Sequence, residues 1–268
     1  KELWNARDLF RDASSCIKSD KECVLATVRR CGDAFQFADA SLKANRTFVL
    51  DVIKISSNAL QFADESLKAD REFILAVVQI DSKAFQFANP VLKADRDFVL
   101  AVVKVHVNAL KYADSQVQAD MEIQKTAKET YIRKVDECNS QGAHELLADG
   151  PEPIKADRDC VLATVSKAGT ALQCASVELK GDKEVVLAAV RNYGNALKFA
   201  DDAIQADKEV QTRAKEAYLE NLKREDCRGA YKLLKDSPMV ISKDQACLLA
   251  TLQKTGRQRS NFGQDFAA

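Results

Sequence analysis

Residues 70–94 read DREFILAVVQIDSKAFQFANPVLKA, and residues 95–119 repeat the pattern as DRDFVLAVVKVHVNALKYADSQVQA. Each segment opens with an aspartate and spans 25 residues. The opening residue, which we number position 0, recurs at Asp20, Asn45, Asp70, Asp95, Asp120, Asp157, Asp182 and Asp207. A period between roughly 20 and 50 residues is typical of units that bury their apolar faces only by stacking on neighbours. The sequence therefore predicts a repeat array.

The first half of each unit carries a helix start and then an apolar block. An aspartate at position 0 accepts hydrogen bonds from the free N–H groups of a first helical turn, which contributes about 1 kcal/mol. The block, for example Phe73-Ile-Leu-Ala76, is apolar on nearly every side, so we expect this helix to lie between neighbouring units. After about eleven residues, Gly32, Gly169 and Gly194 stand where a left-handed residue would end the helix. The middle units carry Ser57, Ser82 and Val107 there, and we expect a kink in those units in place of a full stop.

The second half of each unit predicts a short second helix and a capped turn. A polar residue at position 13, such as Asp33 or Asn58, is typical of a helix start. Two alanines four positions apart follow in six units, for example Ala84 and Ala88, and we interpret them as packing positions that let another helix approach closely. A polar residue at position 19, such as Asp64, is expected to cap the closing turn. The predicted fold is an all-α solenoid of helix-turn-short-helix units.

Two units are longer than the others by the same amount. Segments 120–156 and 207–243 both span 37 residues, align without gaps and lack a helix breaker at the usual position. We therefore expect their first helices to run on beyond the others, before Gly142 and Gly229. The predicted organisation is a single array, residues 1–268: 1–19, tail of a long unit; 20–119, four short units; 120–156, a long unit; 157–206, two short units; 207–243, a long unit; 244–256, a partial unit; 257–268, a tail.

The composition argues against several classes of protein. Lys plus Arg and Asp plus Glu each total 40, so the chain lacks the basic excess that bulk nucleic-acid binding requires. Apolar runs such as residues 98–103 are far shorter than the ~20 residues of a membrane helix, so we expect a soluble protein without membrane insertion. The eight cysteines form no CxxC pair. We expect reduced, mostly buried thiols, which favours an intracellular reducing compartment without identifying it.

The sequence contains no recognisable catalytic or metal-binding motif. Phosphate-binding loops, zinc spacings and the HExxH and GxSxG patterns do not occur. The two histidines, His106 and His144, occupy unrelated positions with no phased nucleophile or carboxylate. Cys23, Cys160 and Cys247 share position 3 with phenylalanines of other units, so we interpret them as small core residues. We predict no enzyme activity, no catalytic residues, no cofactor and no metal.

Three strings carry a resemblance to a known family: Asp70-Arg-Glu-Phe-Ile-Leu-Ala-Val-Val78, Asn195-Ala-Leu-Lys-Phe-Ala-Asp201 and Leu67-Lys-Ala-Asp70. They resemble a family of short tandem α-helical repeats that is catalogued as a domain of unknown function, common in unicellular eukaryotes and some intracellular bacteria. The resemblance covers about residues 20–256, and the two long units and the last unit depart from its pattern. It implies an all-helical array with no established activity, so no catalytic residues carry over.

The expected function is that of a non-catalytic protein-binding scaffold or a structural subunit of a larger protein assembly, because stacked helical units present extended surfaces to other proteins. The alternative is a nucleic-acid-binding repeat protein, which would need a basic or stacking residue at one exposed position in most units. Enzymatic activity would need an enclosed pocket with strongly perturbed pKa values. The sequence identifies no partner site; a basic cluster of Lys254, Arg257 and Arg259 supplies the candidates for contact.

Overall fold

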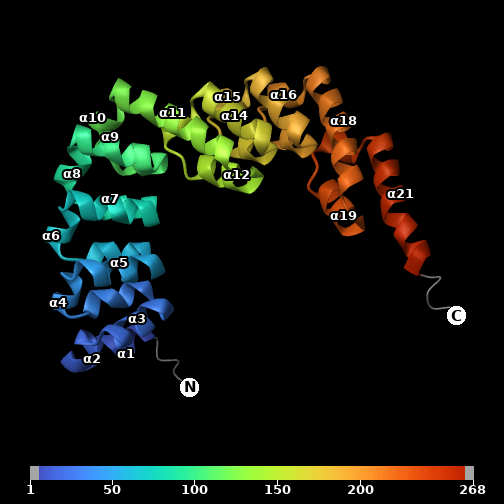
Figure 1. The fold of residues 1–268 in the computed structure, drawn as a ribbon. Coiled ribbons are helices and arrows are strands. Elements are labelled where there is room, and N and C mark those ends of the chain that lie inside the picture. Colours follow the sequence, from blue (N-terminus) through green and yellow to red (C-terminus); the bar gives the residue numbers. More distant parts are fainter. Residues whose placement is uncertain (1–5, 263–268) are drawn as a thin grey trace. The chain divides into compact units, whose positions relative to one another are not determined.

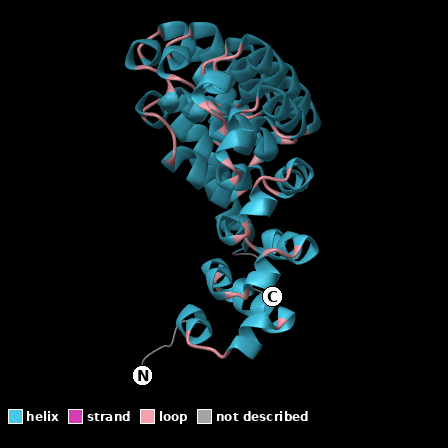
Figure 2. Cartoon of the chain, turned by 90° about the vertical axis from the view of Figure 1, so that its left-hand side faces the viewer, coloured by secondary structure: helices cyan, strands magenta, loops and turns pink. Residues whose placement is uncertain are grey.

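The structure, a computed structural model, describes residues 6–262 and the side chains of residues 6–256 (Figure 1). The described residues form helices joined by short loops, with no strand among them (Figure 2). The all-α repeat fold predicted from the sequence is therefore confirmed. The chain divides into two compact bodies, residues 1–130 and 131–268, and the division falls within the helix α11 (Met121–Glu137).

The N-terminal body contains four short units, preceded by α1 and α2. Each short unit consists of a ten-residue α-helix, a six-residue 3-10 helix and a closing helix of four or five residues. Successive ten-residue helices contact one another and lie side by side in Figure 1. The elements are α1 (Ala6–Arg11), α2 (Ser15–Ser19), α3 (Lys21–Arg30), η1 (Gly32–Phe37), α4 (Ala40–Lys43), α5 (Arg46–Ile55), η2 (Ser57–Phe62), α6 (Glu65–Lys68), α7 (Arg71–Ile80), η3 (Ser82–Phe87), α8 (Pro90–Ala94), α9 (Arg96–Val105), η4 (Val107–Tyr112) and α10 (Ser115–Gln118).

The C-terminal body continues the same pattern with two short units between longer helices. The short units are the sets that begin with α14 and α16. After the end of α11 come α12 (Ser140–Ala148), α13 (Glu152–Lys155), α14 (Arg158–Lys167), η5 (Gly169–Cys174), α15 (Val177–Lys180), α16 (Lys183–Asn192), η6 (Gly194–Phe199), α17 (Asp202–Gln205), α18 (Lys208–Arg224), α19 (Cys227–Lys235), α20 (Met239–Ser242) and α21 (Gln245–Phe262).

The predicted helix starts at position 0 and the predicted closing caps at position 19 are confirmed. The Asp70 side chain accepts a hydrogen bond from the Phe73 N–H at 2.8 Å, which satisfies a donor of the first turn of α7. At the closing helix α6, Asp64 accepts in the same way from the Ser66 N–H at 3.0 Å. Both caps depend on a side chain and its own local backbone, so the sequence pattern predicts them directly.

The predicted end of the first helix is wrong. The last helical residue is at position 10, and the next residue is extended, as at Cys31 before Gly32 with φ −152° and ψ 104° and at Asp81 before Ser82 with φ −151° and ψ 117°. No described residue has a positive φ. The 3-10 helix begins at position 12, so position 13 lies inside it and does not cap it. The side chain that does cap η3 is that of Asp81 itself, which accepts from the Lys83 N–H at 2.8 Å.

Glycine at position 12 is explained by the neighbouring unit. A Cβ on Gly169 would collide with the carbonyl oxygen of Ala189 in α16, and a Cβ on Gly194 would collide with that of Ala214 in α18. Each glycine therefore removes a side chain where the backbone of the next helix passes, and it does so at an ordinary negative φ. The prediction that Gly169 and Gly194 stand at the end of the first helix is therefore correct, but the reason for glycine there is close packing and not a left-handed backbone.

The paired alanines do pack in the core, as predicted, although on a 3-10 helix. Ala84 is fully buried and Ala88 is 3% exposed, and the Phe85 ring beside them is also fully buried. The 3-10 helices η1 to η4 contact one another in succession. The small alanines therefore allow neighbouring 3-10 helices to approach closely.

A backbone hydrogen bond joins a short unit to the closing helix that precedes it. The N–H at position 19 of the short unit donates to the carbonyl of the residue two places before position 0 of that unit. The distances are 3.0 Å for Asp64 to Lys43, 3.0 Å for Asn89 to Lys68, 2.9 Å for Asp114 to Lys93, 2.9 Å for Ser176 to Lys155 and 3.0 Å for Asp201 to Lys180. This bond recurs in both bodies and involves no side-chain atom.

The long units contain uninterrupted first helices, as predicted. Both α11 and α18 have 17 residues and end before Asn139 and Asp226, which cap the following helices α12 and α19. Gly142 and Gly229 lie inside those following helices. In the last unit, α21 continues through Gly256 to Phe262, so the boundary predicted between residues 256 and 257 falls inside a helix.

Candidate functional site

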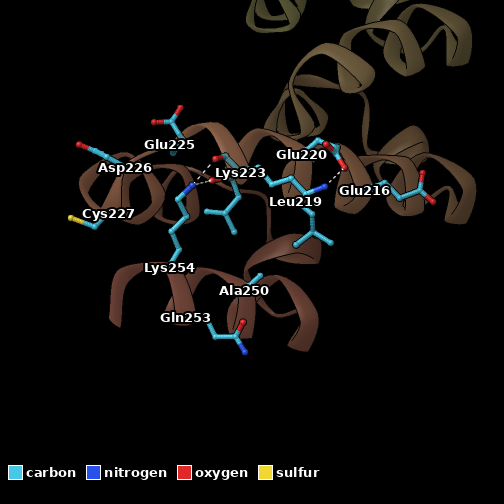
Figure 3. A pocket seen from close by; sticks show the side chains of 11 residues that line it. Glu216, Leu219, Glu220, Lys223, Glu225, Asp226, Cys227, Ala250, Gln253 and Lys254 are labelled. Carbon is cyan, nitrogen blue, oxygen red and sulfur yellow. Dashed lines mark hydrogen bonds and ion pairs between the residues drawn. The ribbon is translucent and has the colours of Figure 1, made fainter. Parts of the chain in front are cut away.

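A groove of about 1050 Å³ lies in the C-terminal body, with α18 and the start of α19 on one side and α21 on the other (Figure 3). Its apolar lining comes from Leu219 and Leu222 of α18 and Ala250 of α21. Four carboxylates and two amines make up its charged lining: Glu216, Glu220, Glu225, Asp226, Lys223 and Lys254. The groove is therefore apolar in its lining and acidic in its net charge.

Both amines of the groove are already engaged. The Lys223 Nζ donates to the Glu220 carboxylate at 2.6 Å, and this hydrogen bond lowers the pKa of Glu220. The Lys254 Nζ reaches across from α21 and donates to the carbonyl oxygens of Leu222 and Lys223 at 2.6 and 2.7 Å (Figure 3). These carbonyls belong to the last turn of α18, where the helix offers no intrahelical donor.

Lys254, a predicted contact candidate, thus binds the end of α18 through its amine, and it is one of the residues that line the groove. The side chains of the other two candidates, Arg257 and Arg259, lie outside the described residues. Lys254 has a counterpart 87 residues earlier in Lys167, whose Nζ donates to the carbonyl oxygens of Val135 and Asp136 at 2.7 Å each. The same contact between a lysine and the end of a long helix therefore occurs twice in this body, and we call the contact between a long helix and the unit that follows it the joint.

A buried hydroxyl pair belongs to the same joint. The Tyr218 hydroxyl of α18 lies 2.8 Å from the Thr251 hydroxyl of α21, and Thr251 donates to the Cys247 carbonyl at 2.8 Å. Burial raises the pKa of Tyr218. The first long unit has the equivalent pair, Tyr131 and Thr164. These tyrosines and threonines were missed from the sequence, although the gapless alignment of the two long units places both tyrosines at one position.

The cysteines are less buried than the sequence suggested. Only Cys160 and Cys247 are fully buried; Cys16 is exposed and the other five are partly exposed. Burial raises the pKa of the Cys247 thiol to about 11. Cys23 shares position 3 with both buried residues but is partly exposed, and the described helices that precede and contact its helix α3 are the short helices α1 and α2. The interpretation as core residues is therefore correct for Cys160 and Cys247 but not for Cys23.

The two histidines belong to different bodies. His106 is the residue after α9 in the N-terminal body, whereas His144 lies in α12 of the C-terminal body. The two ring nitrogens of His144 lie 3.1 Å from Thr170 Oγ1 and 3.2 Å from Gln173 Nε2, so this side chain joins α12 to η5. Within the described part of the chain, no group of three His, Cys, Asp or Glu side chains could hold a metal ion, and no helix is long and apolar enough to cross a membrane.

Comparison with known proteins matches the repeats to one family. The sequence model of a domain of unknown function (DUF4116) matches residues 20–68, 45–93, 70–118 and 152–210. The first three matches begin 25 residues apart, in phase with position 0, and the four together cover more than half of the chain. No curated protein and no solved structure gave a match. This chain, with its ten-residue helices, 3-10 helices and capped closing turns, belongs to the DUF4116 family of unknown function.

Proposed function

We propose that the chain is a non-catalytic protein-binding scaffold or a structural subunit of a larger protein assembly, and that the groove between α18 and α21 binds a protein segment. The observation that carries this proposal is the combination of an apolar lining, Leu219, Leu222 and Ala250, with four carboxylates around it. Such a groove suits the apolar face of an amphipathic helix that carries basic residues at its edges.

The repeated cations favour a protein partner over a nucleic acid. Arg46, Arg71 and Arg96 recur at position 1 of three successive units and would be the natural phosphate ligands. Their guanidinium nitrogens lie 2.6, 2.6 and 2.9 Å from the position 0 carboxylate of the next unit. Phosphates would have to displace these carboxylates.

All eight cysteines are free of disulfides, which supports our proposal of an intracellular reducing compartment.

Affinity purification from the source organism tests the proposal when each co-purifying protein is then tested for direct binding to the purified chain. We expect a protein that binds the wild-type chain and binds a Leu219→Glu variant at least about tenfold more weakly, because a carboxylate would be buried in the apolar lining. Val177→Glu is the matched control, since Val177 is 74% exposed and outside the groove. Circular dichroism verifies that both variants fold.

Two results would contradict the proposal. One is the failure of every co-purified protein to bind the purified chain directly. The other is a salt-dependent gel shift with RNA or DNA, which would instead support the nucleic-acid alternative, because neutralised phosphates release counterions.

A further inference from the structure

One boundary between neighbouring units lacks the ion pairs that other boundaries have. In five of the six short units, the cation at position 1 pairs with the carboxylate at position 0 of the next unit. Four of these cations also pair with the carboxylate at position 2: Arg46 with Glu72, Arg96 with Glu122, Arg158 with Glu184 and Lys183 with Glu209. A lysine reaches both carboxylates, since the Lys183 Nζ lies 2.9 Å from Asp207 Oδ2 and 2.7 Å from Glu209 Oε2.

The exception is the boundary between residues 20–44 and 45–69, in the N-terminal body. Its cation is Lys21, and the next unit presents Asn45 at position 0 and Thr47 at position 2. Lys21 is exposed and forms no ion pair with any residue that the structure describes. Its Nζ lies 5.9 Å from the centroid of the Phe48 ring. Both places that carry a carboxylate at other boundaries are therefore uncharged at this one.

Lys21 is nevertheless placed like the cations that do form ion pairs. The guanidinium carbon of Arg46 lies 5.4 Å from the centroid of the Phe73 ring, while one of its nitrogens lies 2.6 Å from the Asp70 carboxylate. A cation over the ring at position 3 is thus within reach of an anion in the first turn of the same helix. Lys21 over Phe48 has this geometry, and what the boundary lacks is the anion.

Thr47 places a hydroxyl where the other complete units carry an acid. Their residues at position 2 are Glu22, Glu72, Asp97, Glu122, Asp159, Glu184 and Glu209. Thr47 is exposed in the first turn of α5. A phosphate on its Oγ1 would put terminal oxygens the same number of covalent bonds from Cα as the carboxylate oxygens of a glutamate. Phosphothreonine therefore has the reach of the glutamates that form these pairs, and its charge of about −1.5 to −2 at pH 7 is larger.

We propose that Thr47 is a phosphorylation site and that its phosphate pairs with Lys21, as the carboxylates at position 2 pair with the cation of the preceding unit. The modification supplies the anion that this boundary lacks and adds an ion pair between the neighbouring helices α3 and α5. The inference concerns the N-terminal body and does not depend on the groove of the C-terminal body.

The reaction is a phosphoryl transfer from ATP by a protein kinase. A bond forms between Thr47 Oγ1 and the γ-phosphorus, the bond from that phosphorus to the oxygen bridging the β-phosphate breaks, and ADP leaves. The hydroxyl proton, which Thr47 donates to Asn45 Oδ1 at 2.9 Å, passes to a base of the kinase. Loss of this hydrogen bond leaves α5 capped, because Asn45 Oδ1 still accepts from the Phe48 N–H at 3.0 Å.

Two other exposed hydroxyls of this body are poorly placed for a phosphate. Ser41 donates to the Asp39 carboxylate at 2.6 Å, and Ser66 donates to the Asp64 carboxylate at 2.5 Å. A phosphate on either serine would lie beside a like charge, which disfavours it. The side chain that accepts from Thr47 is an uncharged amide.

The first test measures whether the phosphate meets Lys21, and it needs no kinase. The full chain is prepared with genetically encoded phosphothreonine in place of Thr47, and phosphorus NMR at successive pH values gives the second pKa of the phosphate, ordinarily about 6. We expect this pKa to be about 0.2–0.7 lower in the otherwise wild-type chain than in Lys21→Gln, the equivalent of an exposed ion pair. Lys104→Gln removes an exposed cation from α9 of the same body and is the control with an unchanged pKa.

The second test asks whether Thr47 is modified. The full chain isolated from the source organism, and the purified chain incubated with ATP and an extract of that organism, are mapped by phosphopeptide mass spectrometry. We expect phosphate on Thr47 in preference to Ser41 and Ser66, and no phosphate on the same peptide of Thr47→Val.

The inference is overturned if Thr47 carries no phosphate in either sample, or if the second pKa of the phosphate is the same in Lys21→Gln as in the otherwise wild-type chain. Neither result bears on the groove, because Leu219→Glu tests that proposal in the other body.

Discussion

The hydroxyl of Tyr131 lies 2.7 Å from the hydroxyl of Thr164 in a fully buried site, although the two residues are 33 positions apart. Thr164 donates its own proton to the Cys160 carbonyl at 2.7 Å, which leaves its oxygen to accept from the tyrosine. Tyr218 and Thr251 repeat this geometry. Each long helix is thus fixed to the short unit that follows it by one tyrosine.

Replacing Tyr218 by phenylalanine should lower the free energy of unfolding by about 1–2 kcal/mol, because the buried Thr251 oxygen loses its donor while the ring volume is kept. Urea denaturation followed by circular dichroism measures the change. Tyr231→Phe is the matched control: Tyr231 is 65% exposed in the same body, and its variant should stay within about 0.5 kcal/mol of the wild type. Equal effects of the two substitutions would contradict the role of the hydroxyl pair.

The paired alanines predict a second effect on stability. Ala84→Leu or Ala88→Leu should overpack the contacts of η3 and destabilise the protein by about 1–3 kcal/mol. Ala40→Leu, at an exposed alanine in α4 of the same body, should leave the urea midpoint nearly unchanged. An unaltered midpoint for Ala84→Leu would show that this face is not tightly packed.

Position 0 carries two separable interactions. Asp95 caps α9 through the Phe98 N–H at 2.9 Å, and its other oxygen pairs with Arg71 at 2.6 Å. Asp95→Asn should keep the cap, as Asn45 does naturally, and lose only a partly exposed ion pair of at most about 1 kcal/mol. Asp95→Ala should lose about 1 kcal/mol more. The midpoint of thermal unfolding should be highest for the wild type, lower for Asp95→Asn and lowest for Asp95→Ala. A higher midpoint for Asp95→Ala than for Asp95→Asn would refute the capping role.

The same carboxylates make stability depend on pH. The backbone N–H of Phe73 lowers the pKa of Asp70, and that of Phe98 lowers the pKa of Asp95. A carboxylate with a lowered folded-state pKa contributes stability above its unfolded pKa of about 3.9, and the contribution is lost as the pH falls through the folded value. Urea midpoints should therefore be level above about pH 5 and fall below about pH 4. A variant with Asn at both positions should show a shallower fall.

Thiol alkylation should follow burial. With its pKa near 11, buried Cys247 carries little thiolate at pH 8, so iodoacetamide should modify exposed Cys16 first and Cys247 only after unfolding. Peptide mass spectrometry at successive times measures the order. Early modification of Cys247 would mean that α21 leaves α18 readily.

The parts of the fold that depend on neighbouring residues in sequence were predictable. Asp70 and Asp64 cap their helices because the acceptor and the N–H donors lie within three residues of each other. The helix end was not predictable in this way, because glycine serves both as a left-handed residue and as a point of close approach. Gly169 takes the second role only because α16 passes over it, and that neighbour lies in another unit.

The candidate site was predictable only in part. Lys254 does lie in the groove, yet its amine is directed to carbonyls of α18, and nothing in a single lysine indicates which carbonyls lie opposite. Leu219 and Leu222 became a groove lining through the packing of α18 beside α21. The repeated spacing of Tyr131 and Tyr218 was the available signal, and it required comparison of the two long units with each other.

The hydrogen bond from the Asn89 N–H to the Lys68 carbonyl connects two units through backbone atoms alone, so it does not depend on which side chains these residues carry. This bond needs only that the closing turn falls at the same position in each unit. If a whole 25-residue unit is added or removed, every remaining bond of this series therefore keeps its donor and its acceptor. If a single residue is inserted or deleted within a unit, the bond at that unit is lost. Natural length variants of this protein should therefore differ by whole units, and surface loops of intermediate length should be rare among them.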